Sequence, residues 1–126
     1  MKEYFEVKLV RMKNGEDLIA FCYEDVGEQL LHVKYPKSFY FGYDSDSPDP
    51  ELMLNDWLPK QAYAIQQASF PISDTLFISH ANIEFGHFYL QEIVDSLDPE
   101  SDAAKQIVDT IKSMVDEVVP ENTIFH

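Results

Sequence analysis

The chain has 126 residues, of which 45% are hydrophobic and 13% aromatic, so a folded domain is expected and wholesale disorder is excluded. Acidic residues outnumber basic ones 23 to 9, for a net charge of −14, and a surface of this charge repels nucleic-acid backbones, which are bound through cations. The single cysteine, Cys22, excludes an internal disulfide and a multi-cysteine zinc site, while no apolar run reaches the roughly 20 residues that span a bilayer. With a charged N-terminus unlike a signal peptide, a cytoplasmic location and no membrane association are expected.

The charge is unevenly distributed along the chain. Residues 1–39 contain seven acids and six bases, whereas residues 40–126 contain sixteen acids and three bases. Nucleic acid is therefore expected to approach only the near-neutral N-terminal part. The alternative interpretation is that the acids only keep the protein soluble.

The first two predicted strands form a hairpin. Apolar and polar residues alternate over residues 4–12, Asn14-Gly15 follows, and residues 17–23 are again largely apolar. Asn-Gly favours a type I′ turn, in which both central residues have positive φ. Each strand reads as apolar on both faces over part of its length, as in a small closed barrel.

A third strand follows a polar turn that contains Gly27. It is expected to run from Leu30 to Tyr35 and to end at Pro36, because proline cannot donate a hydrogen bond to a sheet. Residues 39–41 extend it if the chain forms a bulge at the proline.

The next segment, residues 44–50, is rich in acids, serine and proline, and is expected to form an exposed, mobile loop. Asp44, Asp46 and Asp49 resemble the alternating ligands of a calcium loop. The glycine at the sixth position and the closing glutamate of such a loop are missing, so no metal is expected.

Two short strands should complete the β-rich part. Residues 52–58 form an apolar patch in which Trp57 is interpreted as core or subunit interface. Residues 62–70 are predicted to form the fourth strand. A tight turn at Pro71 then leads to a fifth strand over residues 75–79.

The last part of the chain is predicted to be helical. Apolar residues recur at helical spacing over residues 84–97. Asp98-Pro99-Glu100 is a typical helix start, with a capping side chain, proline in the first turn and acids near the positive end of the dipole. The apolar face of this second helix continues through Met114, Val115 and Val118, and Pro120 should end it.

Two stretches resemble the Sm-like (LSm and Hfq) proteins. Residues 7–20, an apolar strand, a glycine turn and a strand ending in a small residue, are similar to the first Sm motif, and residues 70–78 to the second. With Trp57-Leu58-Pro59 before the last strands and a helix after them, the chain resembles most the Sm-like proteins of tailed phages, notably cyanophages. The resemblance implies a mainly β fold, a five-stranded antiparallel small barrel over residues 1–82, followed by two helices in residues 83–126.

The resemblance also implies a homo-oligomeric ring of five to seven copies. Sm-like subunits join by pairing the fourth strand of one copy with the fifth strand of the next, and the fifth strand here has no lysine or proline that would block such pairing. The interface candidates come from this strand and from the lone tryptophan: Thr75, Leu76, Phe77, Ile78 and Trp57.

The residues with which Sm proteins bind RNA are largely absent. The second-to-third-strand turn lacks the usual asparagine, and Ser73-Asp74 stands where Arg-Gly is expected. Cations interleaved with aromatic rings nevertheless suit single-stranded nucleic acid. The candidate residues for weak binding are Arg11, Lys13, Lys34, Tyr35, Lys37 and Tyr40.

No catalytic or cofactor-binding motif is recognised, so the protein is not expected to be an enzyme. The histidines, His32, His80, His87 and His126, form no metal-ligating pair. One hypothesis is therefore a ring that binds RNA or DNA in phage nucleic-acid processing. The alternative is a phage interaction or assembly module whose acidic helices dock a protein partner.

Overall fold

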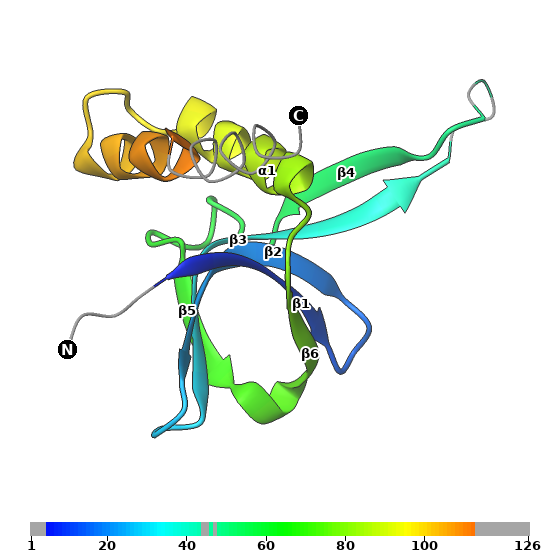
Figure 1. The fold of residues 1–126 in the computed structure, drawn as a ribbon, viewed down its shortest axis with the longest axis vertical. Coiled ribbons are helices and arrows are strands. Elements are labelled where there is room, and N and C mark those ends of the chain that lie inside the picture. The colour runs from blue at the N-terminus through cyan, green and yellow to red at the C-terminus, as the bar shows by residue number, and fades with distance from the viewer. Residues whose placement is uncertain (1–4, 44–45, 47, 113–126) are drawn as a thin grey trace, which may run out of the picture. The chain divides into compact units, whose positions relative to one another are not determined.

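The structure is a computed structural model that describes residues 5–43, 46 and 48–112. The chain separates into two compact units, Met1–Ala81 and Asn82–His126. The first unit contains six strands and a short 3₁₀ helix, and the second contains two helices (Figure 1). Among the described residues, no helix has the length and apolar character needed to cross a membrane.

The six strands of the first unit form one antiparallel sheet. Its order is β4-β3-β2-β1-β6, and β5 pairs with the first half of β3. The mainly β fold with C-terminal helices is therefore as expected, whereas the strand number is six rather than five. The strands are β1 (Glu6–Met12), β2 (Asp17–Asp25), β3 (Leu30–Gly42), β4 (Glu51–Asp56), β5 (Gln67–Pro71) and β6 (Thr75–His80).

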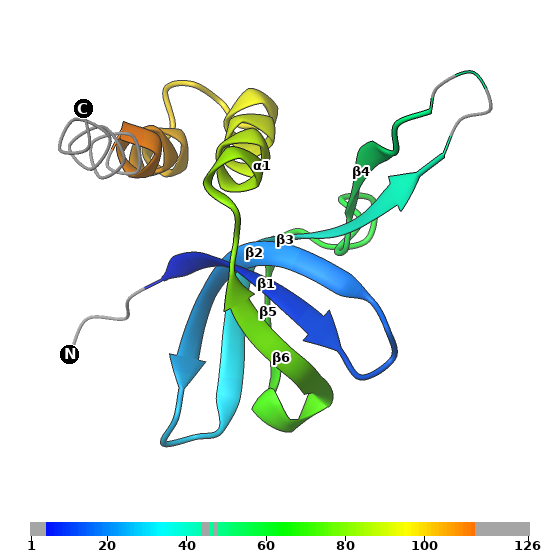
Figure 2. The same cartoon turned by 45° about the vertical axis from the view of Figure 1, so that its right-hand side comes forward.

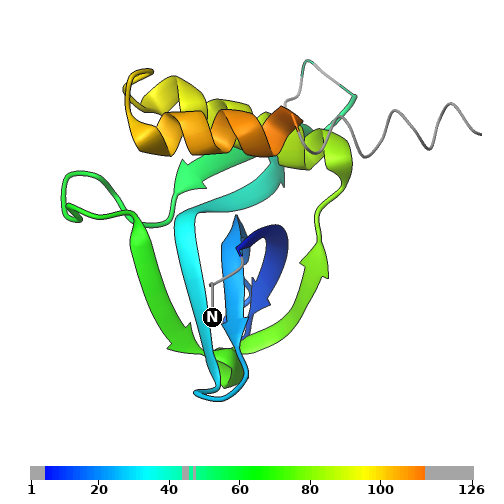
Figure 3. The same ribbon diagram turned by 60° about the vertical axis from the view of Figure 1, so that its left-hand side comes forward.

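The sheet is open, which corrects the expectation of a closed barrel. β5 pairs with β3, and β6 pairs with β1, but no ladder joins β5 to β6 in the part of the chain that the structure describes. The 3₁₀ helix η1 (Ile72–Asp74) connects them, and from it the two strands diverge on either side of β1, β2 and β3 (Figure 3). Each of them is therefore left with one unpaired edge.

The first hairpin is confirmed, but its turn differs from the predicted one. Gly15 has a φ of 93°, while Asn14 is not among the residues with positive φ. The amide of Gly15 donates to the carbonyl of Met12 at 2.9 Å. The turn therefore has Lys13 and Asn14 at its centre, with glycine taking the left-handed position after them.

β3 does not end at Pro36 but continues to Gly42, which is the expected alternative in which residues 39–41 extend the strand beyond a bulge. The register with β2 shifts at this point, from Phe21 opposite Lys34 to Ile19 opposite Lys37. Tyr35 takes a φ of 52° in the resulting bulge. The missing amide hydrogen of Pro36 therefore falls where the ladder is already interrupted, and no hydrogen bond of the sheet is lost.

The segment that was expected to be an apolar patch contains a strand. β4 pairs with the second half of β3 over residues 51–56, and the two strands form an arm that extends away from the other strands of the sheet (Figure 2). The predicted fourth strand, residues 62–70, is shorter than expected. Only residues 67–70 and the following Pro71 form β5. Of the loop between β3 and β4, residues 44, 45 and 47 lie outside the described residues, and residue 46 and residues 48–50 are exposed.

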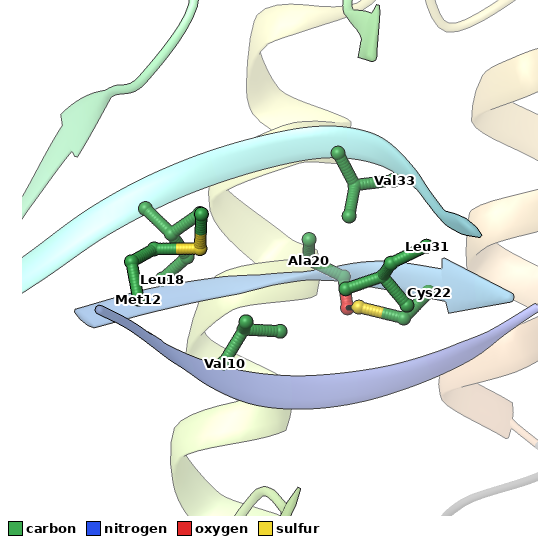
Figure 4. Packing of buried hydrophobic residues seen from close by; sticks show 7 residues of the cluster. All are labelled: Val10, Met12, Leu18, Ala20, Cys22, Leu31 and Val33. Carbon is green, nitrogen blue, oxygen red and sulfur yellow. Dashed lines mark hydrogen bonds between the residues drawn. The ribbon is translucent and has the colours of Figure 1, made fainter. Parts of the chain in front are cut away.

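One buried cluster of the first unit lies on one face of the curled sheet. Seven buried residues from β1, β2 and β3 form it (Figure 4), and side chains of β5 and β6 pack against the same cluster. The sheet therefore curls until its outer strands contact one core, although they do not pair with each other. The buried members are Val10, Met12, Leu18, Ala20, Cys22, Leu31 and Val33.

The second unit begins with α1 (Ile83–Ser96), close to the predicted 84–97. Asn82 caps it, because its side-chain oxygen accepts a hydrogen bond from the amide of Glu84 at 2.8 Å. Its buried residues recur at helical spacing on one face: Gly86, Tyr89, Leu90 and Ile93.

A second helix is described over residues 102–112. It begins later than predicted, because Ser101 provides the cap, with its hydroxyl accepting from the amide of Ala104 at 3.2 Å. Asp98 instead accepts from the amide of Glu100 in the preceding turn. The predicted continuation through Met114, Val115 and Val118 to Pro120 lies outside the described residues.

Candidate assembly edges and nucleic-acid face

The unpaired edges of β5 and β6 belong to the least charged part of the chain. Residues 61–83 contain a single Asp, Glu, Lys or Arg, which is Asp74, whereas 25% of the whole chain is charged. Asp74 lies in η1, between the two strands rather than on either of them. Depletion of charge is a property of surfaces that become buried between subunits.

Some side chains of β6 contact the rest of the subunit, and others are exposed. Leu76 and Phe77 are 60% and 51% exposed. Ile78 packs against the core, and the hydroxyl of Thr75 donates to the carbonyl of Ile72 at 2.7 Å. Of the predicted interface residues on this strand, Leu76 and Phe77 are therefore the exposed ones, and the guanidinium of Arg11 lies 5.5 Å from the centre of the Phe77 ring.

Trp57 is partly buried and packs against the core of its own subunit. Its ring lies 5.8 Å from that of Phe70 in an edge-to-face arrangement, and it packs against the buried cluster. Its backbone amide donates to the carbonyl of Pro36 at 3.3 Å. Of the two interpretations of this residue, packing within the subunit accounts for its contacts.

The turn that joins the two free edges is held on both sides. The amide of Ile72 donates to the carbonyl of Gln29 at 3.0 Å, and the amide of Lys13 donates to the carbonyl of Asp74 at 2.9 Å. η1 therefore lies against both hairpin turns.

The charges on these three turns are mostly negative. The cation Lys13 lies among exposed or half-buried acids of the hairpin turns and of η1. A phosphate at this position would meet more carboxylates than cations, which opposes binding. The acids of the three turns are Glu16, Asp25, Glu28 and Asp74.

The predicted nucleic-acid residues are not brought together, and most of their cations are engaged. Arg11 forms a two-pronged ion pair with Asp17, with distances of 2.7 and 2.9 Å. This pair raises the pKa of Arg11 through the hydrogen bonds and then through charge attraction. Lys37 pairs with Asp56 across the β3–β4 ladder. Both cations are therefore already neutralised by carboxylates of the same chain.

Lys34, Tyr35 and Tyr40 lie on different parts of β3. Lys34 lies over the ring of Phe5, with its nitrogen 4.2 Å from the ring centre, an attraction known as a cation–π interaction. Tyr35 is the bulge residue, and Tyr40 is 51% exposed on the arm. The six candidates therefore do not form one continuous basic surface.

An aromatic row that sequence reasoning missed lies beside Lys34. The rings of Phe5 and Tyr23 are 5.7 Å apart, and Tyr23 stacks on His32 at 5.7 Å with an interplanar angle of 15°. His32 also contacts Ser69, with 2.6 Å between Nδ1 and the hydroxyl. Phe5, His32, Lys34 and Ser69 line a hollow of about 260 Å³. The register of neighbouring strands, which brings these residues onto one face, was the missing information.

Two further side chains that can carry chemistry are Cys22 and His32. Burial raises the pKa of Cys22 to about 12, so its thiol remains protonated and unreactive at neutral pH. Within the described ranges, no group of three His, Cys, Asp or Glu side chains could hold a metal ion. His32 Nε2 lies 3.8 Å from Asp25, which is too long for a hydrogen bond.

A second hollow lies where the arm leaves the sheet. It has a volume of about 390 Å³ and is lined mostly by apolar side chains of β1, β3 and β6. Phe39 and Phe41 form its arm side, and Phe77 connects it to the free edge of β6. The ion pair of Arg11 and Asp17 also lines the hollow, so its apolar surface, which reaches from β6 to the arm, is interrupted by charge.

Compared with known protein families and with curated proteins, the sequence matches none of them. Function must therefore be inferred from the edges and surfaces described above.

Proposed function

We propose that the protein is a non-catalytic assembly module, in which the free edge of β5 in one copy pairs with the free edge of β6 in the next. Repeating this contact produces a ring of Sm-like type, with five to seven copies. The two edges are presented by opposite ends of one curled sheet, so the contact is heterologous and closes into a ring when the rotation between neighbours divides a full turn.

The lack of charge over residues 61–83 carries the proposal. Each chain has a net charge of −14, so repulsion between copies is weakest where the contact surfaces carry few acids. The β5 and β6 edges meet this condition, and they present unpaired backbone donors and acceptors that suit strand addition. Leu76 and Phe77 supply exposed apolar area at the same place.

The test is Leu76→Lys, which places a cation on the β6 edge and blocks strand pairing. Light scattering should show that this variant loses the multi-copy assembly of the unmodified chain. The matched control is Val26→Lys, because Val26 is 71% exposed in the turn between β2 and β3 and belongs to neither edge strand. Equal masses for the two variants, or an unmodified chain that is monomeric at micromolar concentration, would refute the proposal.

A second candidate function, binding of single-stranded RNA or DNA, is favoured by one observation. The row of Phe5, Tyr23 and His32, with Lys34 over Phe5, combines stacking rings with a cation. Fluorescence anisotropy at low salt should then show binding that Lys34→Gln weakens. Lys60→Gln, which removes an exposed lysine elsewhere, is the control. The absence of binding at high micromolar protein removes this candidate.

A further inference from the structure

A third free edge belongs to β4, in the arm. β4 is the last strand of the order β4-β3-β2-β1-β6, and in the described part of the chain it pairs only with β3. Between Glu51 and Asp56 it contains neither lysine nor proline. Such a strand offers a row of backbone donors and acceptors to another chain.

The arm formed by β4 and the second half of β3 is apolar on both faces. Opposite residues share a face, so the pairs Phe41–Leu52 and Phe39–Leu54 lie on one side, and the pair Tyr40–Met53 lies on the other. Phe41 is 57% exposed, Tyr40 51% and Met53 37%. A two-stranded ribbon is marginally stable in water, so apolar area on both of its faces indicates a surface that is covered in the assembled state.

We propose that β4 pairs antiparallel with β4 of a second copy, about a twofold axis through Met53. The two arms then form one four-stranded sheet, β3-β4-β4-β3. This contact is separate from the β5 and β6 edges and does not depend on the proposed ring.

The side chains of β4 favour a second copy of the same strand as the partner, and they favour this register. With the axis at Met53, Leu52 of one copy faces Leu54 of the other, and the carboxylate of Glu51 faces the amide of Asn55. Both pairs are complementary, and the symmetry forms each of them twice.

Neighbouring registers are less favourable. A shift of the axis to the point between Met53 and Leu54 places Glu51 opposite Asp56, which sets two carboxylates against each other. An axis at Leu54 places Leu52 opposite Asp56, which leaves an apolar side chain facing a charge. Asp56 is already bound by Lys37 of its own chain, so in the Met53 register it needs no partner from the second copy.

Disulfide cross-linking of Met53→Cys tests the contact directly. Opposite residues of an antiparallel pair have Cβ atoms about 4.5–5.5 Å apart, close to the spacing that a disulfide requires. The native Cys22 is buried and does not interfere. Under mild oxidation, Met53→Cys should form a covalent dimer on denaturing electrophoresis.

Glu51→Cys is the matched control on the same strand. In the proposed register the two copies of residue 51 are four residues apart along the strands, or about 13 Å, so this variant should cross-link at least tenfold more slowly. Equal rates for the two variants, or no dimer from Met53→Cys, would overturn the proposal.

The experiment also separates this contact from the proposed ring. In a chain that carries both Leu76→Lys and Met53→Cys, the cross-linked dimer should still form, because the β6 edge is not involved. Loss of the dimer in that background would show that the arms meet only as a consequence of ring contacts, and would overturn the twofold pairing as a separate interface.

Discussion

The two halves of β3 have similar composition and different surroundings. Residues 30–35 pair with β2 on one side and β5 on the other, and Leu31 and Val33 are 0% and 1% exposed. Residues 37–42 pair mainly with β4, and Tyr40 and Phe41 are half exposed. The apolar sequence is therefore similar in both halves of β3, and the curl of the sheet determines which of these apolar side chains become buried within one chain.

The comparison predicts a large difference between two truncations. Leu31→Ala should lower the free energy of unfolding by about 2–5 kcal/mol, because it leaves a cavity in the core. Phe41→Ala should lower it by about 0.5 kcal/mol or less. Urea unfolding measures both, in a Met53→Lys background that blocks the proposed β4 contact. Equal costs would show that the arm is as well covered as the core within one chain.

The thiol opposite the first half of β3 provides a prediction on pH. Cys22 lies opposite Val33, and its pKa rises from 9.0 to about 12 on burial. Between these values only the unfolded state loses the proton, so the stability from Cys22 is complete below pH 9 and falls as the pH rises toward 12. At pH 11, two units above the unfolded pKa, the loss should be roughly 3 kcal/mol.

To measure this loss, the free energy of unfolding is determined for the unmodified chain and for Cys22→Ala at pH 8 and at pH 11. The difference in free energy between the two proteins should change between the two pH values. A cysteine introduced at Phe41, which is 57% exposed, should react rapidly with a thiol reagent while Cys22 does not. A difference that stays constant with pH would contradict burial of Cys22.

The ion pair at the start of the arm is expected to have a smaller effect. Lys37 and Asp56 have side chains 17% and 33% exposed, so Asp56→Asn should lower the free energy of unfolding by about 0.5–1 kcal/mol. Added salt should reduce the difference between the two proteins. An effect that does not change with salt would point to lost packing instead of lost charge attraction.

The smallest predicted effect lies just before the first half of β3. Gln29 has a φ of 59° and is exposed, a conformation that costs about 1 kcal/mol for a residue other than glycine. Gln29→Gly should therefore raise the free energy of unfolding by about 0.5 kcal/mol, after the entropy cost of glycine. Thermal unfolding measures the gain in stability. Glu28→Gly is the control, because Glu28 does not have a positive φ and its replacement should give no gain.

The local elements could be predicted where periodicity and turn residues act over a few residues. The first hairpin, β6 and α1 lie within a few residues of their predicted ranges. Whether β3 stops at Pro36 or continues beyond a bulge was left open by the sequence, because the bulge depends on pairing with β2. β4 was missed because its Leu52-Met53-Leu54 run does not alternate in the sequence, and its strand character depends on pairing with β3.

The candidate site could be predicted only in part. β6 follows from its β-prone residues, whereas the engagement of Arg11 and Lys37 depends on the cross-strand placement of Asp17 and Asp56. The aromatic row of Phe5, Tyr23 and His32 likewise depends on register between three strands. A single sequence carries no direct information about these pairings, which are long-range contacts.

The 3₁₀ turn η1 has a consequence for the number of copies. It fixes the angle between the β5 and β6 edges, and hydrogen bonds to Gln29 and Lys13 prevent it from changing that angle freely. In a ring, the same angle sets how far each subunit is rotated from its neighbour. If the proposed ring forms, an inserted residue within Ile72–Asp74 is therefore expected to change the number of copies that close it.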